Sequence, residues 1–261
     1  MILCDLDGTL LNDKGEINDI DKAFVKMAVK NGVEFIICTG RSFMSAERFY
    51  KELEILKEEN IGIFYNGSLI YDIVSKKIFY EQRIKIHDTI DIIKKCSNFK
   101  ADIIVYIGDK PVVEKVTPLI DMYMKRSLIS PFICKDFNAY IDCDVSKILL
   151  KGDNSDLKKA MDYFQKDGRN VFFSSDTLLE FNPINITKGS AVKEIAKIKN
   201  IDIKNVIAIG DTFNDLDMIK TAGLGAVPLN ASYEIKNNAD YVCENDNNNG
   251  AVSEIIKKFV L

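Results

Sequence analysis

Two pairs of aspartates stand directly after apolar runs in distant parts of the chain. Asp5 and Asp7 follow a run at the N-terminus, and Asp211 and Asp215 follow a run in the last quarter. Carboxylates brought to one point repel one another unless a cation neutralises them. A ligand set of oxygens without His or Cys favours a hard ion. We therefore predict that the protein binds Mg2+ at these aspartates.

Beside a bound cation, one carboxylate can attack phosphorus and form an aspartyl-phosphate, and Asp5 is the candidate nucleophile. Asp7, where the chain turns after the apolar run, can protonate the leaving oxygen and later deprotonate the attacking water. The phosphoryl oxygens also need fixed donors. The predicted donors are the side chains of Thr39 and Lys188 and the backbone amides of Leu6 and Gly40. These residues together predict phosphoryl transfer.

The elements that must bring these residues together are predicted from the hydrophobic pattern. The first third of the chain has a β-α-β-α-β rhythm, and the last quarter resumes it. Nearly continuous apolar runs at 33–38 and 205–209 are typical of parallel strands buried on both faces. In the first helix, Ile20, Phe24 and Met27 fall on one apolar stripe. The predicted strands are 2–6, 33–38, 61–65, 205–209 and 225–229, and the predicted helices are 19–31, 42–56, 188–200, 214–221 and 250–259.

Ligands of open α/β sheets bind beyond the carboxyl ends of the strands, so we expect the polar clusters to converge on one sheet edge. The segment between the two alternating regions has a different pattern and is predicted to be a second, inserted α+β domain. Its predicted elements are helices at 87–99, 117–127 and 155–166 and strands at 103–107, 112–115, 147–151, 170–174 and 178–181. The predicted fold class is thus α/β, a Rossmann-like doubly wound parallel sheet core of residues 1–82 and 184–261 with an inserted domain of residues 83–183.

Composition narrows the class of partner. The net charge is -4, with acidic and basic residues interleaved, which offers no electrostatic footprint for nucleic acid or an anionic membrane. No apolar run approaches the roughly 18 residues of a membrane span, and no export signal precedes the first strand. The six cysteines are dispersed, as expected of free thiols in a reducing compartment. We predict a cytoplasmic protein whose partner is a small-molecule phosphate ester, with its oligomeric state left open.

Four segments resemble, in order, the motifs of the haloacid dehalogenase-like (HAD) superfamily. They are Asp5-Leu6-Asp7-Gly8-Thr9-Leu10-Leu11, Thr39-Gly40-Arg41, Lys188-Gly189 and Gly210-Asp211-Thr212-Phe213-Asn214-Asp215. The insertion is similar to the α/β cap of the Cof-like sugar-phosphatase branch, as are Asn66-Gly67-Ser68 and Leu179-Glu180-Phe181-Asn182-Pro183. The resemblance covers the whole chain. It implies a phosphomonoesterase acting on a hexose phosphate or on a phosphorylated cofactor such as pyridoxal phosphate or flavin mononucleotide.

The resemblance also implies a role for each matching residue. Asp5 is the nucleophile and Asp7 the acid/base. Mg2+ is held by Asp5, the backbone carbonyl of Asp7 and Asp211, with Asp215 supporting the metal. The phosphate site is lined by Thr39, Gly40, Lys188 and Asn214. The chain departs from the branch at Asn185-Ile186-Thr187, because a small residue, often Gly, commonly precedes the lysine. This departure leaves the backbone before Lys188 open.

Several alternatives remain at this stage. A phosphosugar mutase would use the same nucleophile but return the phosphoryl group to a sugar. A non-enzymatic sensor would hold an acyl phosphate or a ligand, although it would need neither Asp7 nor a large insertion. Arg41 could bind substrate or pair with a carboxylate, and Asn66 is interpreted as a turn residue. The substrate itself depends on residues of the insertion that periodicity does not identify.

Overall fold

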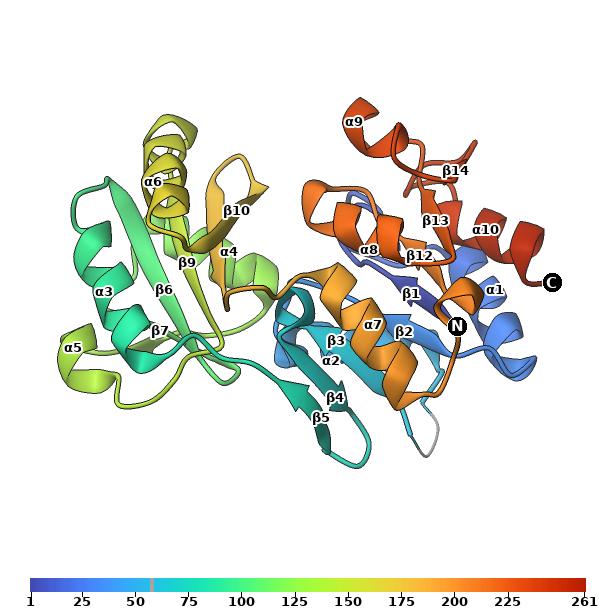
Figure 1. The fold of residues 1–261 in the computed structure, drawn as a ribbon, viewed down its shortest axis with the longest axis horizontal. Coiled ribbons are helices and arrows are strands. Elements are labelled where there is room, and N and C mark those ends of the chain that lie inside the picture. The colour runs from blue at the N-terminus through green and yellow to red at the C-terminus, as the bar shows by residue number, and fades with distance from the viewer. Residues whose placement is uncertain (57–58) are drawn as a thin grey trace. The chain divides into compact units, whose positions relative to one another are not determined.

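The computed structural model describes residues 1–56 and 59–261 (Figure 1). The chain folds into two compact units. One unit contains Met1–Glu81 and Thr187–Leu261, and the other contains Gln82–Ile186. The second unit thus interrupts the first in sequence.

The first unit is built on a five-stranded sheet in which every neighbouring pair of strands is parallel. Its strands, in spatial order, are β14 (Tyr241–Val242), β13 (Leu224–Val227), β12 (Ile207–Ile209), β1 (Ile2–Cys4) and β2 (Phe35–Ile37). In β1, Leu3 pairs with Ile36 on one side and Ala208 on the other, and all three residues are buried. Burial of such a side chain contributes about 1.5–3 kcal/mol. This sheet confirms the predicted α/β class with a parallel core.

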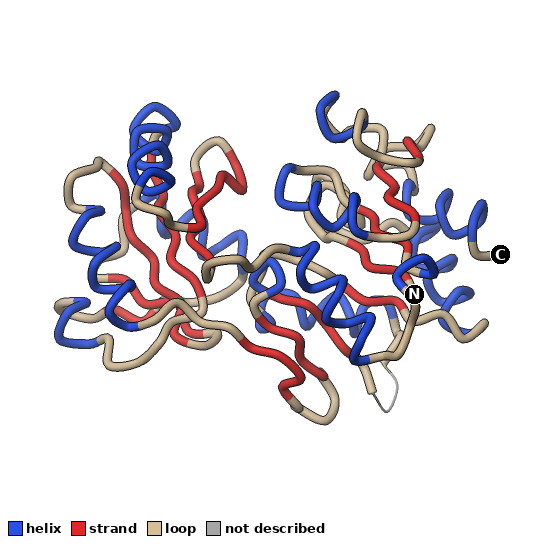
Figure 2. The backbone as a smooth tube through the Cα atoms, in the orientation of Figure 1, coloured by secondary structure: helices blue, strands red, loops and turns tan. Residues whose placement is uncertain are grey.

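Helices cover the faces of this sheet (Figure 2). Ala191, Val192 and Ile195 of one helix and Met218 of another pack into the same apolar cluster as Leu3. These two helices are α7 (Lys188–Ile198) and α8 (Leu216–Thr221). The other helices of the unit are α1 (Asp19–Lys30), α2 (Phe43–Leu53), α9 (Tyr233–Lys236) and α10 (Ala251–Phe259).

Helix α1 does not bury its most apolar stripe. Ile20 is 51% exposed and Met27 is 46% exposed. The buried positions are instead Asp21, Val25 and Ala28, one residue further round the helix. The reason lies in α10, which packs on α1 and whose Ser253 amide donates a 2.6 Å hydrogen bond to Asp21 Oδ1. Capping of a neighbouring helix therefore sets the orientation of α1, which hydrophobicity alone did not indicate.

A small antiparallel sheet follows α2 in the chain. It consists of β3 (Ile61–Phe64), β4 (Leu69–Asp72) and β5 (Ile78–Glu81), and a parallel bridge between Cys38 and Ile63 joins β3 to the chain just after β2. The hairpin of β4 and β5 was not predicted. Its turn depends on Asp72, whose Oδ1 accepts a hydrogen bond from the amide of Val74. Such a side-chain-to-backbone turn leaves only a weak sequence signal.

The second unit has a six-stranded, mainly antiparallel sheet. Its strands in spatial order are β10 (Asn170–Ser175), β11 (Leu178–Asn182), β9 (Lys147–Gly152), β6 (Ala101–Ile107), β7 (Lys110–Val113) and β8 (Phe132–Ile133). Its helices are α3 (Ile86–Cys96), α4 (Pro118–Ser127), α5 (Phe137–Tyr140) and α6 (Asn154–Lys166). Val105 and Phe181 pair with Ile148 from the strands on either side of it, and all three side chains share a core with Phe164 of α6.

Among residues 1–56 and 59–261, no helix is both long enough and apolar enough to cross a membrane. The six cysteines carry free thiols, and all but the half-buried Cys143 are buried.

Candidate active site

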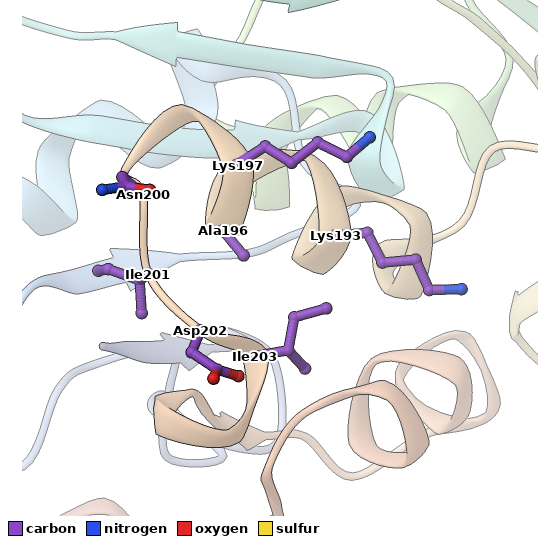
Figure 3. Close-up of a pocket in the computed structure, with 7 residues that line it drawn as sticks. All are labelled: Lys193, Ala196, Lys197, Asn200, Ile201, Asp202 and Ile203. Atoms are coloured by element: carbon purple, nitrogen blue, oxygen red, sulfur yellow. The ribbon is translucent and has the colours of Figure 1, made fainter.

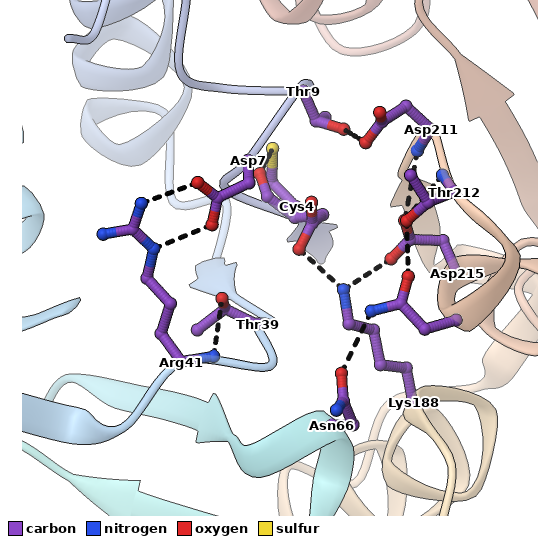
Figure 4. A network of polar contacts seen from close by, with 12 residues as sticks. Cys4, Asp7, Thr9, Thr39, Arg41, Asn66, Lys188, Asp211, Thr212 and Asp215 are labelled. Atoms are coloured by element: carbon purple, nitrogen blue, oxygen red, sulfur yellow. Dashed lines mark hydrogen bonds and ion pairs between the residues drawn. The ribbon is translucent and has the colours of Figure 1, made fainter. Parts of the chain in front are cut away.

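The carboxyl ends of three neighbouring strands carry the predicted chemistry (Figure 4). Asp5 directly follows β1, Thr39 is the second residue after β2, and Asp211 is the second residue after β12. The sheet ladder continues to this edge, where the Asp5 amide donates to the Ile209 carbonyl over 2.9 Å. All of these residues belong to the unit that contains both chain ends. The convergence expected from the strand order is therefore present within one unit.

Lys188 lies at the centre of the cluster. Its Nζ donates to Asp5 Oδ1 at 2.6 Å and to Asp215 Oδ1 at 2.5 Å. Lys188 and Asp215 have no exposed surface, and Asp5 is 5% exposed. Burial acts to lower the pKa of Lys188, but the carboxylates of Asp215 and Asp5 outweigh it and raise that pKa well above its ordinary value. Lys188 is thus a fixed ammonium beside the candidate nucleophile.

Thr187 places Lys188 at the first position of α7. The Thr187 Oγ1 accepts a 3.0 Å hydrogen bond from the Ser190 amide, and the Thr187 amide donates to Ser190 Oγ over 3.1 Å. This reciprocal pair is a capping box. The Thr187 hydroxyl also donates to Asp217 Oδ2. Thr187, which stands where the related proteins often have a small residue, is therefore the N-cap of α7. This cap fixes the backbone conformation before Lys188, which the sequence did not predict.

Asp215 organises the loop that carries Asp211. Its Oδ2 accepts hydrogen bonds from the amides of Asp211 and Thr212, each at 3.1 Å. Asp211 Oδ1 in turn accepts a 2.9 Å bond from the hydroxyl of the buried Thr9. Burial, helped by the nearby charge of Asp215, raises the pKa of Asp211 to about 7. Thr9 received no role from the sequence, although it lies inside the first motif.

The carboxylates form a cluster suited to a hard cation. One oxygen from each of Asp5, Asp211 and Asp215 lies within 4.8 Å of the others. Burial raises the pKa of Asp5 well above its ordinary value, and the other carboxylates add to this effect while Lys188 opposes it. Three carboxylates thus face one ammonium, and a divalent cation would relieve their repulsion. This oxygen-only donor set fits Mg2+.

Asp7 directs its side chain elsewhere. Its carboxylate accepts hydrogen bonds from Arg41, at 2.7 Å from Nε to Oδ2 and at 2.6 Å from Nη2 to Oδ1. Its side chain is 43% exposed, compared with 7% for Asp5. Only the backbone carbonyl of Asp7 was expected to hold Mg2+, and the side chain remains outside the carboxylate cluster. Arg41, for which two roles were open, is paired with a carboxylate in the structure.

The predicted phosphate-binding residues surround the cluster. Thr39 is buried, and its Oγ1 accepts a 3.1 Å bond from the Arg41 amide. Asn214 donates through Nδ2 to Asn66 Oδ1 at 3.1 Å, and the Asn66 amide donates to the Thr39 carbonyl at 3.0 Å. Leu6 is buried at the turn after β1, and the side chain of Asn66 packs against Gly40. Asn66 is a turn residue with φ 55°, as interpreted, but its link to Asn214 was missed.

A separate surface hollow lies at the C-terminal end of α7 and at the following turn, η2 (Ile203–Asn205) (Figure 3). It is lined by Lys193, Ala196, Lys197, Asn200, Ile201, Asp202 and Ile203. None of the residues of the carboxylate cluster lines it.

Known proteins share this sequence pattern and architecture. The family model of haloacid dehalogenase-like hydrolases matches residues 2–256. The 5-amino-6-(5-phospho-D-ribitylamino)uracil phosphatase YcsE of Bacillus subtilis is 31% identical over 267 residues, which cover 100% of this chain and 96% of that protein. A haloacid dehalogenase-like hydrolase from Bacteroides thetaiotaomicron aligns with a TM-score of 0.89 and 28% identity, over 98% of this chain and 97% of that one. A HAD subclass IIB sugar phosphatase shares the fold, with a TM-score of 0.85 and 17% identity over 99% and 98% of the two chains. The chain therefore belongs to the haloacid dehalogenase-like hydrolase family.

Proposed function

We propose that this HAD-family phosphatase hydrolyses small phosphorylated metabolites in a Mg2+-dependent reaction, through an aspartyl-phosphate on Asp5. The observation that carries the proposal is the setting of Asp5. Its carboxylate lies buried at the end of β1, 2.6 Å from Lys188 Nζ and within the oxygen cluster of Asp211 and Asp215. A carboxylate in this setting has a fixed position and a cationic neighbour, as a nucleophile toward phosphorus requires.

The first step transfers the phosphoryl group to the protein. A carboxylate oxygen of Asp5 attacks phosphorus, and the bond from phosphorus to the alcohol oxygen breaks. The electron pair of that bond stays on the leaving oxygen, which receives a proton from the carboxyl group of Asp7. Mg2+, held by Asp5, the backbone carbonyl of Asp7 and Asp211 with support from Asp215, would offset the repulsion between carboxylate and phosphate.

The second step returns the protein to its starting state. The carboxylate of Asp7 takes a proton from water as the water oxygen attacks phosphorus, and the bond from phosphorus to Asp5 breaks. Inorganic phosphate leaves, and the carboxylate of Asp5 is restored. The phosphoryl oxygens are held by the side chains of Lys188, Thr39 and Asn214 and by the amides of Leu6 and Gly40. Donors fixed in advance stabilise the transferring group without reorganisation.

We assign substrate selection to the inserted domain, residues 83–183 in the predicted bounds. YcsE is named for a substrate that carries its phosphate on a ribityl chain, and its 31% identity supports a phosphorylated cofactor or precursor as one substrate class. Sugar phosphates are the other class. The free thiols support a reducing, cytoplasmic location.

Product analysis with a panel of phosphate esters and Mg2+ tests the proposal. Stoichiometric release of inorganic phosphate is expected. A sugar phosphate isomer as product would identify a mutase instead. A stable aspartyl-phosphate without turnover would identify a sensor. In each assay, Asp5→Asn serves as the control without a nucleophile.

A further inference from the structure

Arg41 and Asp7 are joined by two hydrogen bonds beside the carboxylate cluster, and this pair of hydrogen bonds is called the fork. Arg41 Nε donates to Asp7 Oδ2 at 2.7 Å, and Arg41 Nη2 donates to Asp7 Oδ1 at 2.6 Å. Both groups are planar, so two parallel hydrogen bonds fix the plane of the carboxylate as well as its position. A single hydrogen bond would fix only the distance.

Arg41 is itself held in place by its surroundings. Its guanidinium carbon lies 5.4 Å from the centre of the Phe49 ring, and Phe49 is fully buried in α2. Its amide donates to Thr39 Oγ1 at 3.1 Å, and its carbonyl accepts from the Tyr65 amide at 3.1 Å. The side chain of Arg41 is only 16% exposed. The fork is therefore an anchored part of the loop after β2.

Asp7 needs such a support because its side chain is 43% exposed. A short carboxylate at a partly solvated position can occupy several rotamers, and a proton donor works only within hydrogen-bond reach of the leaving oxygen. Each carboxylate oxygen has two lone pairs, and the fork occupies one on each oxygen. A carboxylate oxygen that accepts one hydrogen bond from Arg41 can still carry or accept a proton while Arg41 stays in place.

We infer that Arg41 is the positioning residue for Asp7, which it holds in the orientation required for proton transfer to the leaving oxygen and from the attacking water. The inference rests on the proposed role of Asp7 as acid/base. Arg41 acts through Asp7 and does not itself bind the phosphate. Its loss should therefore slow the chemical step while substrate affinity stays unchanged.

Leaving groups that differ in their need for a proton separate this role from a structural one. An alkoxide from a hexose phosphate needs a proton to leave, whereas the phenolate of p-nitrophenyl phosphate leaves without one. The measurement is rapid-quench release of the leaving group in a single turnover, with Arg41→Met, Arg41→Lys and the wild type. Arg48→Met is the matched control, because Arg48 also lies over the Phe49 ring, at 4.4 Å, on the exposed side of α2.

With the hexose phosphate, Arg41→Met should slow the first step about 100-fold, because general acid catalysis contributes on the order of 100- to 10,000-fold. With p-nitrophenyl phosphate, the loss should stay below about 10-fold, and KM should change less than about threefold for both substrates. Arg41→Lys keeps the charge without the fork and should remain impaired with the hexose phosphate. Arg48→Met should behave as the wild type.

Three results would overturn the inference. They are equal losses for both leaving groups, a raised KM with an unchanged first step, and full activity of Arg41→Lys. Thermal unfolding of each variant is measured in parallel, and if Arg41→Met does not fold, Arg41→Lys decides. Turnover by Asp5→Asn would refute the proposed function itself. An inactive Asp5→Asn together with a normal Arg41→Lys would refute only the role of Arg41.

Discussion

Lys188 and Asp215 form an ion pair from which water is excluded. The Nζ of Lys188 lies 2.5 Å from Asp215 Oδ1, and neither side chain has exposed surface. The same Nζ lies 2.6 Å from Asp5 Oδ1. Charges buried in this way are tolerated only as a set, because each one loses its hydration and relies on its partners. The stability of the fold is therefore coupled to the integrity of the carboxylate cluster.

Removal of one member of this set should be costly. Asp215→Asn leaves the ammonium of Lys188 with one carboxylate partner, and we expect the free energy of unfolding to fall by about 3–5 kcal/mol. Lys188→Met should have a similar effect, because it leaves two carboxylates facing each other. The double variant should lose less than the sum of both, by at least about 1 kcal/mol. Urea unfolding of all four proteins measures this coupling, and strictly additive losses would contradict it.

Mg2+ affinity should depend on pH through Asp211. Burial raises the pKa of Asp211 to about 7, and a carboxylate must be ionised to bind a metal. Protons therefore compete with Mg2+ for Asp211 below about pH 7, and the affinity for Mg2+ should rise as the pH increases through about 7. Calorimetric titration with MgCl2 at several pH values measures the effect. Asp211→Asn should bind at least about 10-fold more weakly and show a flatter pH profile. An unchanged profile in this variant would contradict the assignment.

A second pH effect should arise far from the site, at Asp21. Burial raises the pKa of Asp21 from 3.8 to about 6, although the hydrogen bond from Ser253 opposes the shift. The fold thus favours the protonated form. The contribution of Asp21 to the free energy of unfolding is present in full below pH 3.8 and is lost as the pH rises through about 6. The loss amounts to about 3 kcal/mol, from a shift of about two units.

Denaturant unfolding between about pH 4 and about pH 8 tests this sign. The free energy of unfolding of Asp21→Asn, relative to the wild type, should rise by about 2–3 kcal/mol over the interval. Asp19→Asn is the matched control, because Asp19 is on the same helix and its side chain is fully exposed. A constant difference between Asp21→Asn and the wild type would show that Asp21 does not titrate in this range.

Gly8 should tolerate no side chain. It has φ +80°, and an added Cβ would lie 2.3 Å from Asp211 Oδ2. Gly8→Ala should thus displace Asp211 and lower kcat about 100-fold, because small displacements of catalytic groups are costly. Gly15 has a similar φ of +77° but no atom within 4 Å of its added Cβ. Gly15→Ala should therefore cost only about 1–2 kcal/mol of backbone strain and leave kcat unchanged. Equal effects on kcat would contradict the steric explanation.

The central strands could be predicted from the sequence because a parallel strand is buried on both faces, so nearly all of its residues are apolar. Leu3, Ile36 and Ala208 lie in such strands. It did not predict which stripe of α1 is buried, because that choice depends on the hydrogen bond between Asp21 and Ser253, which are 232 residues apart. Contacts of this kind have no local pattern. The pairing of Arg41 with Asp7 could not be predicted from the sequence either, because a carboxylate and a substrate phosphate both attract a guanidinium.

Lys188 shows the same limit at the site itself. A lysine at the start of a helix is by default a solvated side chain, and only its place among four ordered motifs indicated a role. Its burial between Asp5 and Asp215 is a property of the assembled sheet edge. The order of the motifs thus indicates the proposed catalytic residues, whereas the packing of the folded chain determines their charge balance.

In the proposed mechanism, Asp5 carries the phosphoryl group between the two steps. The direct measurement is rapid acid quenching during turnover with Mg2+, followed by mass spectrometry of the peptide that contains Asp5. We predict a transient phosphoryl group on Asp5 in the wild type, and neither that group nor turnover in a folded Asp5→Asn protein. Phosphate release by Asp5→Asn at the wild-type rate, or a phosphoryl group found on another residue, would contradict this prediction.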